Sequence, residues 1–542
     1  MNDVHKCEQD NMTQFDYLIV GAGSAGCVLA DSLSADGRSQ VMLIEAGPED
    51  SNPLVHMPKG FGKLLSDPKH AWFFPTEPEA SNGQRAEYWV RGKLLGGSSS
   101  VNGMVYVRGQ TQDYDHWARL GLGEWSWNAM APYFKRMEDH WLGADALRGV
   151  GGPLGISSSS PRYELGDAVL SAARDLGIPV KEDLNRLDQE GIAYLSATIK
   201  GGRRQSAAQA FLKPARRRAN LTVVTDTTVQ RVLFDGRRAF GVLAKGAGGS
   251  EEYRARQIIL SAGALQSPKL LQLSGIGPGG LLQSMGIATL IDSRDVGQNM
   301  REHRLLFIQH RLKRGGSLNK AFGGLPLIMN TLRYLVTRTG VMAGGAYDIG
   351  GFARSRPGLD RPDVQLMMAP YSMNFAAESY EFEKSPGMQV FGYVLRPKSR
   401  GTVMIRSPNP DDPPTIHPNY LSTDEDRTAS IDMIKLMRRW MAQKPLANFV
   451  AEETTPGIGV QSDAEIVDAF ARLGQSGYHA CGTCRMGGDQ GAVLDSRSRV
   501  RGVENLRVVD LSMFPDMISG NTNGPMMAVA GRAADLIQED TR

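Results

Sequence analysis

Cysteine is scarce in this chain, with four residues among 542, at positions 7, 27, 481 and 484. So few thiols cannot build the disulfide framework of a small secreted fold. No run of about 18 apolar residues occurs, so the sequence predicts no membrane-spanning helix. The first residues, MNDVHKCEQDNMTQ, lack the apolar segment that a secretory signal needs. We therefore expect a cytoplasmic protein and leave open a peripheral association with a membrane.

A strong excess of charge is also lacking, because the formal net charge is only +3. Basic clusters such as Arg216-Arg217-Arg218 are too sparse for a nucleic-acid-binding arm. We interpret this cluster as a solvated face and expect no nucleic-acid partner. The length predicts two to four domains or one large interleaved body, and 62 glycines with 28 prolines favour turns and backbone-lined sites.

The strongest local pattern lies near the start of the chain. Phe15–Val20 is an apolar run bounded by glycine, which predicts a buried strand. The sequence GAGSAG follows, then a helical stretch, CVLADSLSA, and then a second apolar run, VMLIEAG (Val41–Gly47). This order of strand, turn, helix and strand has the size of a βαβ unit.

The glycine-rich turn predicts a binding site for a dinucleotide. Gly21, Gly23 and Gly26 form G-x-G-x-x-G after a strand, and Glu45 follows the last glycine by 19 residues. The glycines allow a close approach of the backbone to a pyrophosphate, the helix N-terminus offers free N–H groups, and Glu45 can accept hydrogen bonds from ribose hydroxyls. This pattern does not choose between FAD and NAD. Only one such turn is present, so we expect one bound dinucleotide and a small second substrate.

Segments far apart in the chain are expected to share the first sheet. Arg256–Ala264 and Asn505–Ser512 are further buried strands, and GRAADLIQED predicts a final helix. DVQLMMAP, MQVFGYVLRP and TVMIRS predict strands of a second sheet, and TASIDMIKLMRRWMAQ predicts an amphipathic helix. The predicted fold class is α/β, a Rossmann-like dinucleotide-binding domain with an α+β, sheet-based substrate domain. We assign residues 1–160, 210–300 and 475–542 to the first domain, and residues 161–209 and 301–474 to the second.

The stretch SGYHACGTCRMGG contains His479, Cys481 and Cys484. Three interpretations are open: a metal site, a redox-active disulfide, or a catalytic base with two packing thiols. One Cys-x-x-C and one histidine supply at most three zinc ligands, so we expect no metal. A disulfide reductase would normally require a second nucleotide site for NAD(P)H. The stretch alone does not decide among the three.

Four longer motifs resemble the glucose–methanol–choline (GMC) family of flavoprotein oxidoreductases. They are RGKLLGGSSSVNGMVYVRG (Arg91–Gly109), SAGALQSPKLLQLSGIGP (Ser261–Pro278), YHACGTCRMG, and LRVVDLSMFPDMISGNTNGPMMAVAGRAADLI. Together with the N-terminal turn, they run through nearly the whole chain in order. The likeness is greatest to choline-dehydrogenase-like and to aliphatic or aryl alcohol members.

The resemblance implies FAD as the cofactor. A second glycine block, with Gly96, Gly97 and Asn102, would wrap the flavin, the backbone of Val229 would meet adenine, and Asp510 would lie near the ribityl chain. Some family members tether FAD through a histidine at the position of Val101, so we expect non-covalent FAD here. The residues expected at the cofactor are Gly21, Gly23, Ser24, Ala25, Gly26, Glu45, Ala46, Trp72, Arg91, Gly97, Ser98, Asn102, Gly103, Met104, Val105, Val229, Ala262, Asp510, Asn521 and Thr522.

The resemblance also implies an alcohol oxidoreductase with two catalytic residues. His479 matches the family's catalytic histidine, and histidine suits a base that accepts a proton near neutral pH while the flavin N5 takes the hydride. Asn521 matches the second position, with Asn523 as the alternative. Electrons would pass to O₂ or to a quinone-type or dye acceptor. The competing hypotheses are a flavin disulfide reductase using Cys481 and Cys484, and a flavoprotein without enzymatic activity.

The substrate is expected to be a neutral, partly apolar primary alcohol. Met367, Met368 and Met373 form an apolar cluster that is either core or pocket wall. Asp348 could instead hold a cationic group, which keeps a choline-type substrate as the alternative. Trp72, Phe73 and Phe74 are either core aromatics or part of a loop over the flavin. The oligomeric state stays open.

Overall fold

The first sheet contains five parallel strands, drawn from three distant parts of the chain. In the computed structural model, which describes residues 15–374 and 381–541, their order is β11 (Leu221–Val224), β2 (Val41–Ile44), β1 (Phe15–Val20), β14 (Gly249–Leu260) and β25 (Leu506–Val508). β2, β25, the last four residues of β1 and the last three of β14 are buried and consist mainly of Val, Ile and Leu, as expected when both faces of a parallel sheet are covered.

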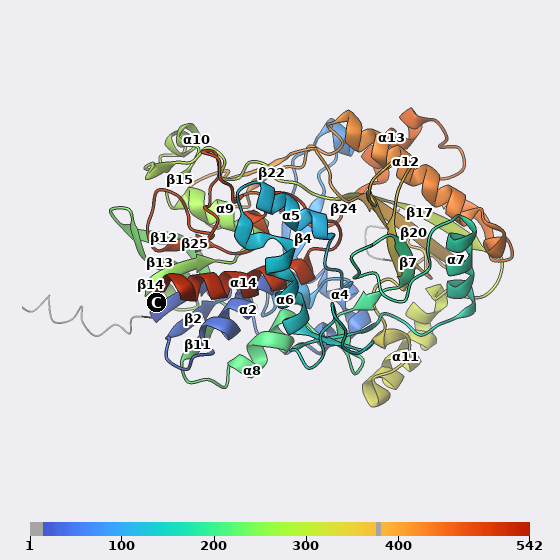
Figure 1. Ribbon diagram of the computed structural model, residues 1–542, viewed down its shortest axis with the longest axis horizontal. Helices are drawn as coiled ribbons and strands as arrows, with labels where there is room; N and C mark the ends of the chain where they lie inside the picture. Colours follow the sequence, from blue (N-terminus) through green and yellow to red (C-terminus); the bar gives the residue numbers. More distant parts are fainter. Residues whose placement is uncertain (1–14, 375–380, 542) are drawn as a thin grey trace, which may run out of the picture.

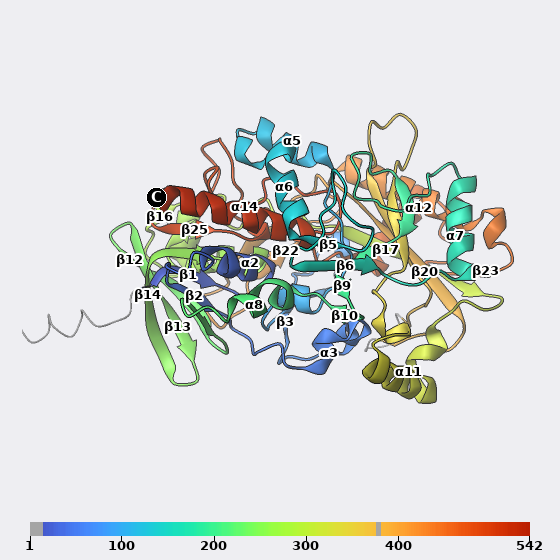
Figure 2. The same ribbon diagram turned by 60° about the horizontal axis from the view of Figure 1, so that its bottom comes forward.

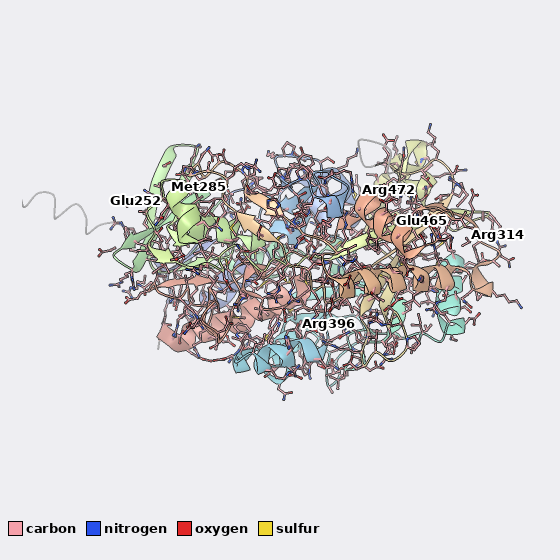
Figure 3. The ribbon with its side chains drawn as sticks, turned by 90° about the horizontal axis from the view of Figure 1, so that it is seen from above. Glu252, Met285, Arg314, Arg396, Glu465 and Arg472 are labelled. Carbon is pink, nitrogen blue, oxygen red and sulfur yellow. The ribbon has the colours of Figure 1, made fainter. Side chains whose placement is uncertain are left out.

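β14 joins two kinds of sheet. Its second half pairs in parallel with β1 and β25, whereas its first half pairs in antiparallel with β13 (Arg238–Gly246), which continues to β12 (Thr228–Asp235). The antiparallel part forms the green hairpins at one end of the molecule (Figure 1). Glu252 on this hairpin and Arg314 beyond the second sheet lie near opposite ends of the long axis (Figure 3).

Two helices from opposite ends of the chain cover one side of the parallel sheet. α2 (Ser24–Leu33) and α14 (Asn523–Thr541) pack against each other, and α6 (Trp127–Met137) packs on α14 (Figure 1). This packing explains why the first and last motifs of the sequence meet, although almost 500 residues separate them. Ser24 Oγ donates a hydrogen bond to Asn523 Oδ1 across the contact, at 2.7 Å.

The second sheet is antiparallel throughout. Its order is β23 (Val450–Thr455), β17 (Arg304–Leu312), β20 (Gly387–Val394), β19 (Val364–Ala369), β18 (Ile349–Ala353) and β7 (Gly191–Tyr194), and β24 (Gln475–Ser476) also pairs with β17. The helices α7 (Glu164–Asp175), α12 (Asp424–Met441) and α13 (Asp463–Leu473) pack on one face, around Trp440 and Leu366. On the other face, Phe307 and Phe391 pack in one cluster with Val105 and Val107, which follow the second glycine block.

The strands expected in 363–370 and 388–397 are confirmed in this sheet, but the one expected in TVMIRS is not. β21 (Thr402–Met404) forms a separate two-stranded sheet with β22 (Thr415–His417). Its apolar residues pack beside α9 (Gly263–Leu273) instead, which a local pattern of hydrophobicity cannot reveal. The residue boundaries of the two domains stay a proposal.

Several smaller elements connect and cover the sheets. They include the hairpin β3 (Ala71–Pro75) and β4 (Tyr88–Gly92), α5 (Thr111–Arg119), α10 (Gly279–Ser284), and α11 (Gly324–Thr337). Figure 2 shows α11 on the outside of the molecule, below the second sheet. Among residues 15–374 and 381–541, no helix combines the length and apolar character needed to cross a bilayer.

Candidate active site

The turn between β1 and α2 has the geometry of a phosphate-binding loop. Gly21 has a φ of 99°, which side chains rarely tolerate, and a Cβ on Gly26 would lie 1.9 Å from the Gly21 carbonyl oxygen. Gly23 is the N-cap of α2, and no side chain caps the first turn of this helix. A Cβ on Gly23 would meet no atom within 4 Å. The first N–H groups of α2 therefore face open space, as binding of a pyrophosphate requires.

Glu45 follows β2 and lies beside this loop. Its carboxylate accepts hydrogen bonds from the Ala22 N–H at 2.8 Å and from the Gly47 N–H at 2.9 Å, which fix its orientation. Burial raises the pKa of Glu45 to about 7. A buried acceptor at the end of the second strand is placed to bind ribose hydroxyls.

The second glycine block packs directly onto the first. A Cβ on Gly97 would lie 2.7 Å from Gly23 Cα, so the two loops touch. Asn102 in this block is fixed by Arg204, whose guanidinium donates to the Asn102 side-chain oxygen at 2.8 Å and to the Ser99 carbonyl at 3.2 Å. Arg204 is buried, and it therefore determines the shape of a loop about 100 residues earlier in the chain.

Asp510 lies two residues after the end of β25 and links the ends of two strands by hydrogen bonds. Its two oxygens accept hydrogen bonds from the Gly263 N–H at 2.9 Å and from the Ser512 N–H at 2.8 Å. The Ser267 and Ser512 hydroxyls also donate to it. Asp510 thus joins the ends of β14 and β25, on the edge of the sheet where α/β proteins bind ligands.

These elements surround one cavity of about 680 Å³. Of the residues expected at the cofactor, all except Gly26 line it, and so do His479, Phe73 and Phe74. Gly26 instead packs against Gly21 beneath the loop, which is a structural role in close packing. Trp72, Phe73 and Phe74 lie on strand β3, not in a loop. Whether each lining residue contacts the cofactor stays a prediction.

His479 and Asn521 meet at one end of this cavity. Asn521 Nδ2 lies 3.3 Å from His479 Nε2, and Asn521 Oδ1 accepts a hydrogen bond from Gln365 Nε2 at 3.0 Å. Gln365 in turn accepts a hydrogen bond from the Tyr393 hydroxyl at 2.6 Å. This chain of contacts turns the Asn521 NH₂ group toward the histidine. Asn523 instead accepts from Ser24, so Asn521 is the residue that contacts His479.

A second histidine, His303, fixes the tautomer of His479. The two Nδ1 atoms lie 2.8 Å apart, and His303 Nε2 lies 3.0 Å from the Leu395 carbonyl oxygen. A carbonyl can only accept, so His303 Nε2 carries the hydrogen and its Nδ1 has a free lone pair. His479 Nδ1 must then donate to His303, which leaves His479 Nε2 without a hydrogen and able to accept a proton.

Buried charges reinforce this arrangement. Glu302 Oε1 accepts hydrogen bonds from the backbone N–H groups of His303 and His479, both at 2.8 Å, and burial raises the pKa of Glu302 to about 7. Burial, followed by His303 and the Arg91 guanidinium, holds the pKa of His479 well below its usual range. His479 is therefore neutral near pH 7, as a proton acceptor must be.

The second sheet supplies an apolar wall beside His479. Leu305, Phe307, Met367, Phe391 and Tyr393 belong to neighbouring strands and line the cavity, and Tyr347 adds a further ring. Successive residues of a strand point to opposite faces, so Leu306, Leu366 and Met368 pack against the helices instead.

Two sequence expectations about this wall are wrong. Met367, Met368 and Met373 do not form one cluster, because Met367 lines the cavity, Met368 lies in the core behind the sheet, and Met373 packs with Tyr371. Asp348 does not face the cavity. It is buried next to Lys59 and Tyr163, and burial raises the pKa of its carboxyl.

Cys481 and Cys484 are fully buried free thiols. Burial raises the pKa of both thiols, so they stay protonated and are poor nucleophiles and poor metal ligands. Neither lines the cavity, and Cys481 Sγ contacts Met517 Sδ at 3.7 Å. Within the described residues, no group of three or more His, Cys, Asp or Glu side chains is arranged to hold a metal ion.

His303, Glu302, Gln365 and Arg204 are the site residues that sequence reasoning missed. Arg204 and Gln365 give no local signal, because an isolated polar residue in a glycine-rich turn or a strand usually has a solvent-exposed or purely structural role. Glu302 and His303 stand directly before an apolar strand, in REHRLLFIQH. Charged residues at the entrance of a buried strand could have marked them as candidates.

The fold and the cavity are those of a dinucleotide-binding protein, with His479 as a candidate base inside the cavity. Two family models, both described as GMC oxidoreductase, match residues 15–305 and 397–530. The chain therefore belongs to the GMC oxidoreductase family. It binds FAD and oxidises alcohols.

Similar proteins cover nearly the whole chain. Mitochondrial choline dehydrogenase of Mus musculus is 41% identical over 97% of this chain and 89% of its own length. Alcohol dehydrogenase [acceptor] of Pseudomonas putida is 37% identical over 96% of this chain and 95% of its own length. Among solved structures, pyridoxine 4-oxidase from Mesorbium loti is 33% identical, with a TM-score of 0.88, over 97% of this chain and 99% of that chain. Formate oxidase of Aspergillus oryzae is 27% identical, with a TM-score of 0.91, over 97% of this chain and 98% of that chain.

Proposed function

We propose that this enzyme oxidises a neutral, partly apolar primary alcohol to the aldehyde, with His479 as the base. The observation that carries this proposal is the wall of Leu305, Phe307, Met367 and Phe391 beside His479. The carboxylates that line the cavity are Glu45 and Asp510, on the dinucleotide-binding elements, and Asp411, which forms an ion pair with Lys245 of β13. An apolar wall without a carboxylate favours an uncharged chain or ring, since burial of a cation without a partner is costly.

The two polar groups at this end of the cavity converge on one position for a hydroxyl group. A substrate oxygen that lies beside both nitrogens, which are 3.3 Å apart, would donate its hydrogen to His479 Nε2 and accept a hydrogen bond from Asn521 Nδ2. His303 keeps His479 Nε2 free of hydrogen, and Gln365 keeps the Asn521 amide turned toward it. FAD, when bound, supplies a hydride acceptor. The apolar wall excludes water, which strengthens both hydrogen bonds.

The glycine loops fit FAD held without a covalent bond. The open space over Gly23 and the contact between Gly97 and Gly23 leave room for a pyrophosphate. Val101 lines the cavity and has no nucleophile. Acid denaturation should therefore release all of the flavin into the supernatant, and flavin retained in the protein pellet contradicts this part of the proposal.

Choline is the second candidate substrate. Several relatives at about 40% identity are choline dehydrogenases, and the rings of Tyr347, Phe307 and Phe391 could hold a quaternary ammonium group by cation–π contacts. An anaerobic panel of 1-butanol, 1-octanol, benzyl alcohol and choline separates the two. The proposal expects the neutral alcohols to bleach the flavin faster than choline, and the reverse order contradicts it.

Electrons leave through O₂ or through a quinone-type acceptor. Relatives with both descriptions exist, an oxygen-dependent choline dehydrogenase and an alcohol dehydrogenase [acceptor]. Comparison of reoxidation by O₂ and by a quinone analogue, after reduction by the best alcohol, decides between them.

We also propose a cytoplasmic location, supported by the buried free thiols, because disulfides are rare in reducing compartments.

A further inference from the structure

Helix α11 exposes an apolar stripe along its whole length. Six of its side chains are between 48% and 84% exposed, and they are Leu325, Ile328, Met329, Leu332, Leu335 and Val336. The described residues contain fourteen exposed large apolar side chains, so almost half of them lie on this one helix. Single exposed apolar residues are normal, but a contiguous patch marks a site of interaction.

The spacing of the six residues places them on one side of the helix. At about 100° per residue, they span an arc of roughly 120°. Tyr334 lies on the opposite side, where it is buried against Met57 and Met342. The stripe therefore points away from the protein. In Figures 1 and 2, α11 lies at the outer edge of the molecule, as this orientation requires.

Positive charge surrounds the stripe. Residues 313–343 contain five Lys or Arg residues and no Asp or Glu. Lys320, Arg333 and Arg338 form no ion pair with a described residue, although Arg338 lies over the Tyr334 ring at 5.0 Å. The nearby Glu383 accepts a hydrogen bond from Ser372 and lies 3.5 Å from Arg311. Within residues 313–343, the charged side chains beside the stripe are thus all cationic.

We propose that α11 docks onto an anionic lipid bilayer, with its apolar stripe in the interface and Lys320, Arg333 and Arg338 on the headgroups. An apolar face with cationic edges is typical of helices that lie in a membrane surface. A second copy of the chain is the weaker candidate for this surface, since a two-fold contact would oppose two sets of positive charges. The cations match the negative charge of an anionic bilayer.

The position of α11 relates this surface to the cavity. Met57, which packs under Tyr334, precedes the short helix Pro58–Gly60, and the next residue, Phe61, lines the cavity. Docking of α11 therefore brings one wall of the cavity close to the bilayer. An apolar alcohol or a lipophilic acceptor dissolved in the bilayer would then reach the site over a short path. This consequence rests on the proposed function, whereas the docking of α11 does not.

Flotation of the FAD-loaded protein with vesicles tests the docking without any assay of activity. The probes are vesicles of phosphatidylcholine alone and of phosphatidylcholine with phosphatidylglycerol. We expect binding to the anionic vesicles, and roughly tenfold weaker binding for the double variant Ile328→Gln, Leu332→Gln, because two apolar side chains leave the interface. The matched control is Leu187→Gln, Ile458→Gln, which changes two exposed apolar residues elsewhere and should bind as the parent does.

Three outcomes would overturn the proposal. The first is no binding of the parent protein to anionic vesicles, and the second is equal binding of both double variants. The third is light scattering that shows a dimer broken by the α11 variant, without vesicle binding, which assigns the stripe to a second copy. A tryptophan introduced as Leu332→Trp should also be quenched by brominated lipid, whereas Leu187→Trp should not. Flavin content checks that each variant is folded.

Discussion

The Nδ1 atoms of His303 and His479 lie 2.8 Å apart, and this contact determines which nitrogen of His479 can act as a base. Because His303 Nε2 donates to the Leu395 carbonyl, the only consistent hydrogen placement leaves His479 Nε2 free. The same nitrogen faces the Asn521 amide. The Leu395 carbonyl therefore determines, through two successive hydrogen bonds, which nitrogen of His479 can accept a proton.

Replacement His479→Ala should lower kcat by roughly 10² to 10⁴, the usual contribution of a general base. FAD should stay bound, since His479 is not part of the glycine loops. Stopped-flow reduction and the flavin-to-protein ratio measure the two properties separately. A variant that keeps the parent rate would remove His479 from the mechanism.

Replacement His303→Phe should lower kcat by roughly 10- to 100-fold, because the His479 Nδ1 hydrogen loses its acceptor and the tautomer is no longer fixed. Phenylalanine can keep the stacking on Tyr393, whose ring centre lies 4.2 Å from that of His303. His303→Asn, which offers an acceptor oxygen, should recover part of the rate. If both variants lose the same activity with unchanged pH profiles, His303 has only a packing role.

The pH dependence should reflect the lowered pKa of His479. A base acts in its neutral form, so activity falls as the pH drops through its pKa. Burial, followed by the neighbouring His303 ring and the Arg91 guanidinium, moves that pKa below 6.5, the ordinary value. We therefore expect kcat/KM for a neutral alcohol to stay at its plateau down to pH 6.5 and to fall only in more acidic buffer. A midpoint above 6.5 contradicts the burial argument.

The pair Cys481 and Cys484 should be dispensable for catalysis. The double replacement with alanine should keep most activity and cost about 1 kcal/mol of unfolding free energy per site, from lost packing. Cys7 lies outside the described residues, so thiol titration should start from a Cys7→Ser background. In that background the native protein should show no reactive thiol, before or after dithiothreitol. Loss of activity with FAD still bound would point to a role for the thiols.

Met367 offers a test of the cavity wall. Met367→Glu places a carboxylate beside His479, so it should reduce kcat/KM for 1-octanol and improve the ratio of choline to 1-octanol at least tenfold. Met367→Gln, of similar size and without charge, is the matched control and should leave that ratio near the parent value. An unchanged ratio in the glutamate variant would show that Met367 does not contact the substrate.

Much of the fold was accessible from the sequence because its strands and glycine loops are local patterns. Phe15–Val20 was predicted with the bounds of β1, and His479 lines the cavity with Asn521, where the family resemblance implied. What failed depends on side-chain direction and long-range packing. Met367 and Met368 are adjacent in sequence but point to opposite faces of a sheet. His303 meets His479 only after β24 pairs with β17, a contact across 176 residues.

The most direct test of the central claim is single-turnover reduction of the FAD-loaded enzyme by 1-octanol under anaerobic conditions, in the parent and in His479→Ala. The account predicts rapid bleaching in the parent, loss of the rate by at least 10²-fold in the variant, and slower reduction of the parent by choline. Equal rates in both proteins, or faster reduction by choline, would contradict it.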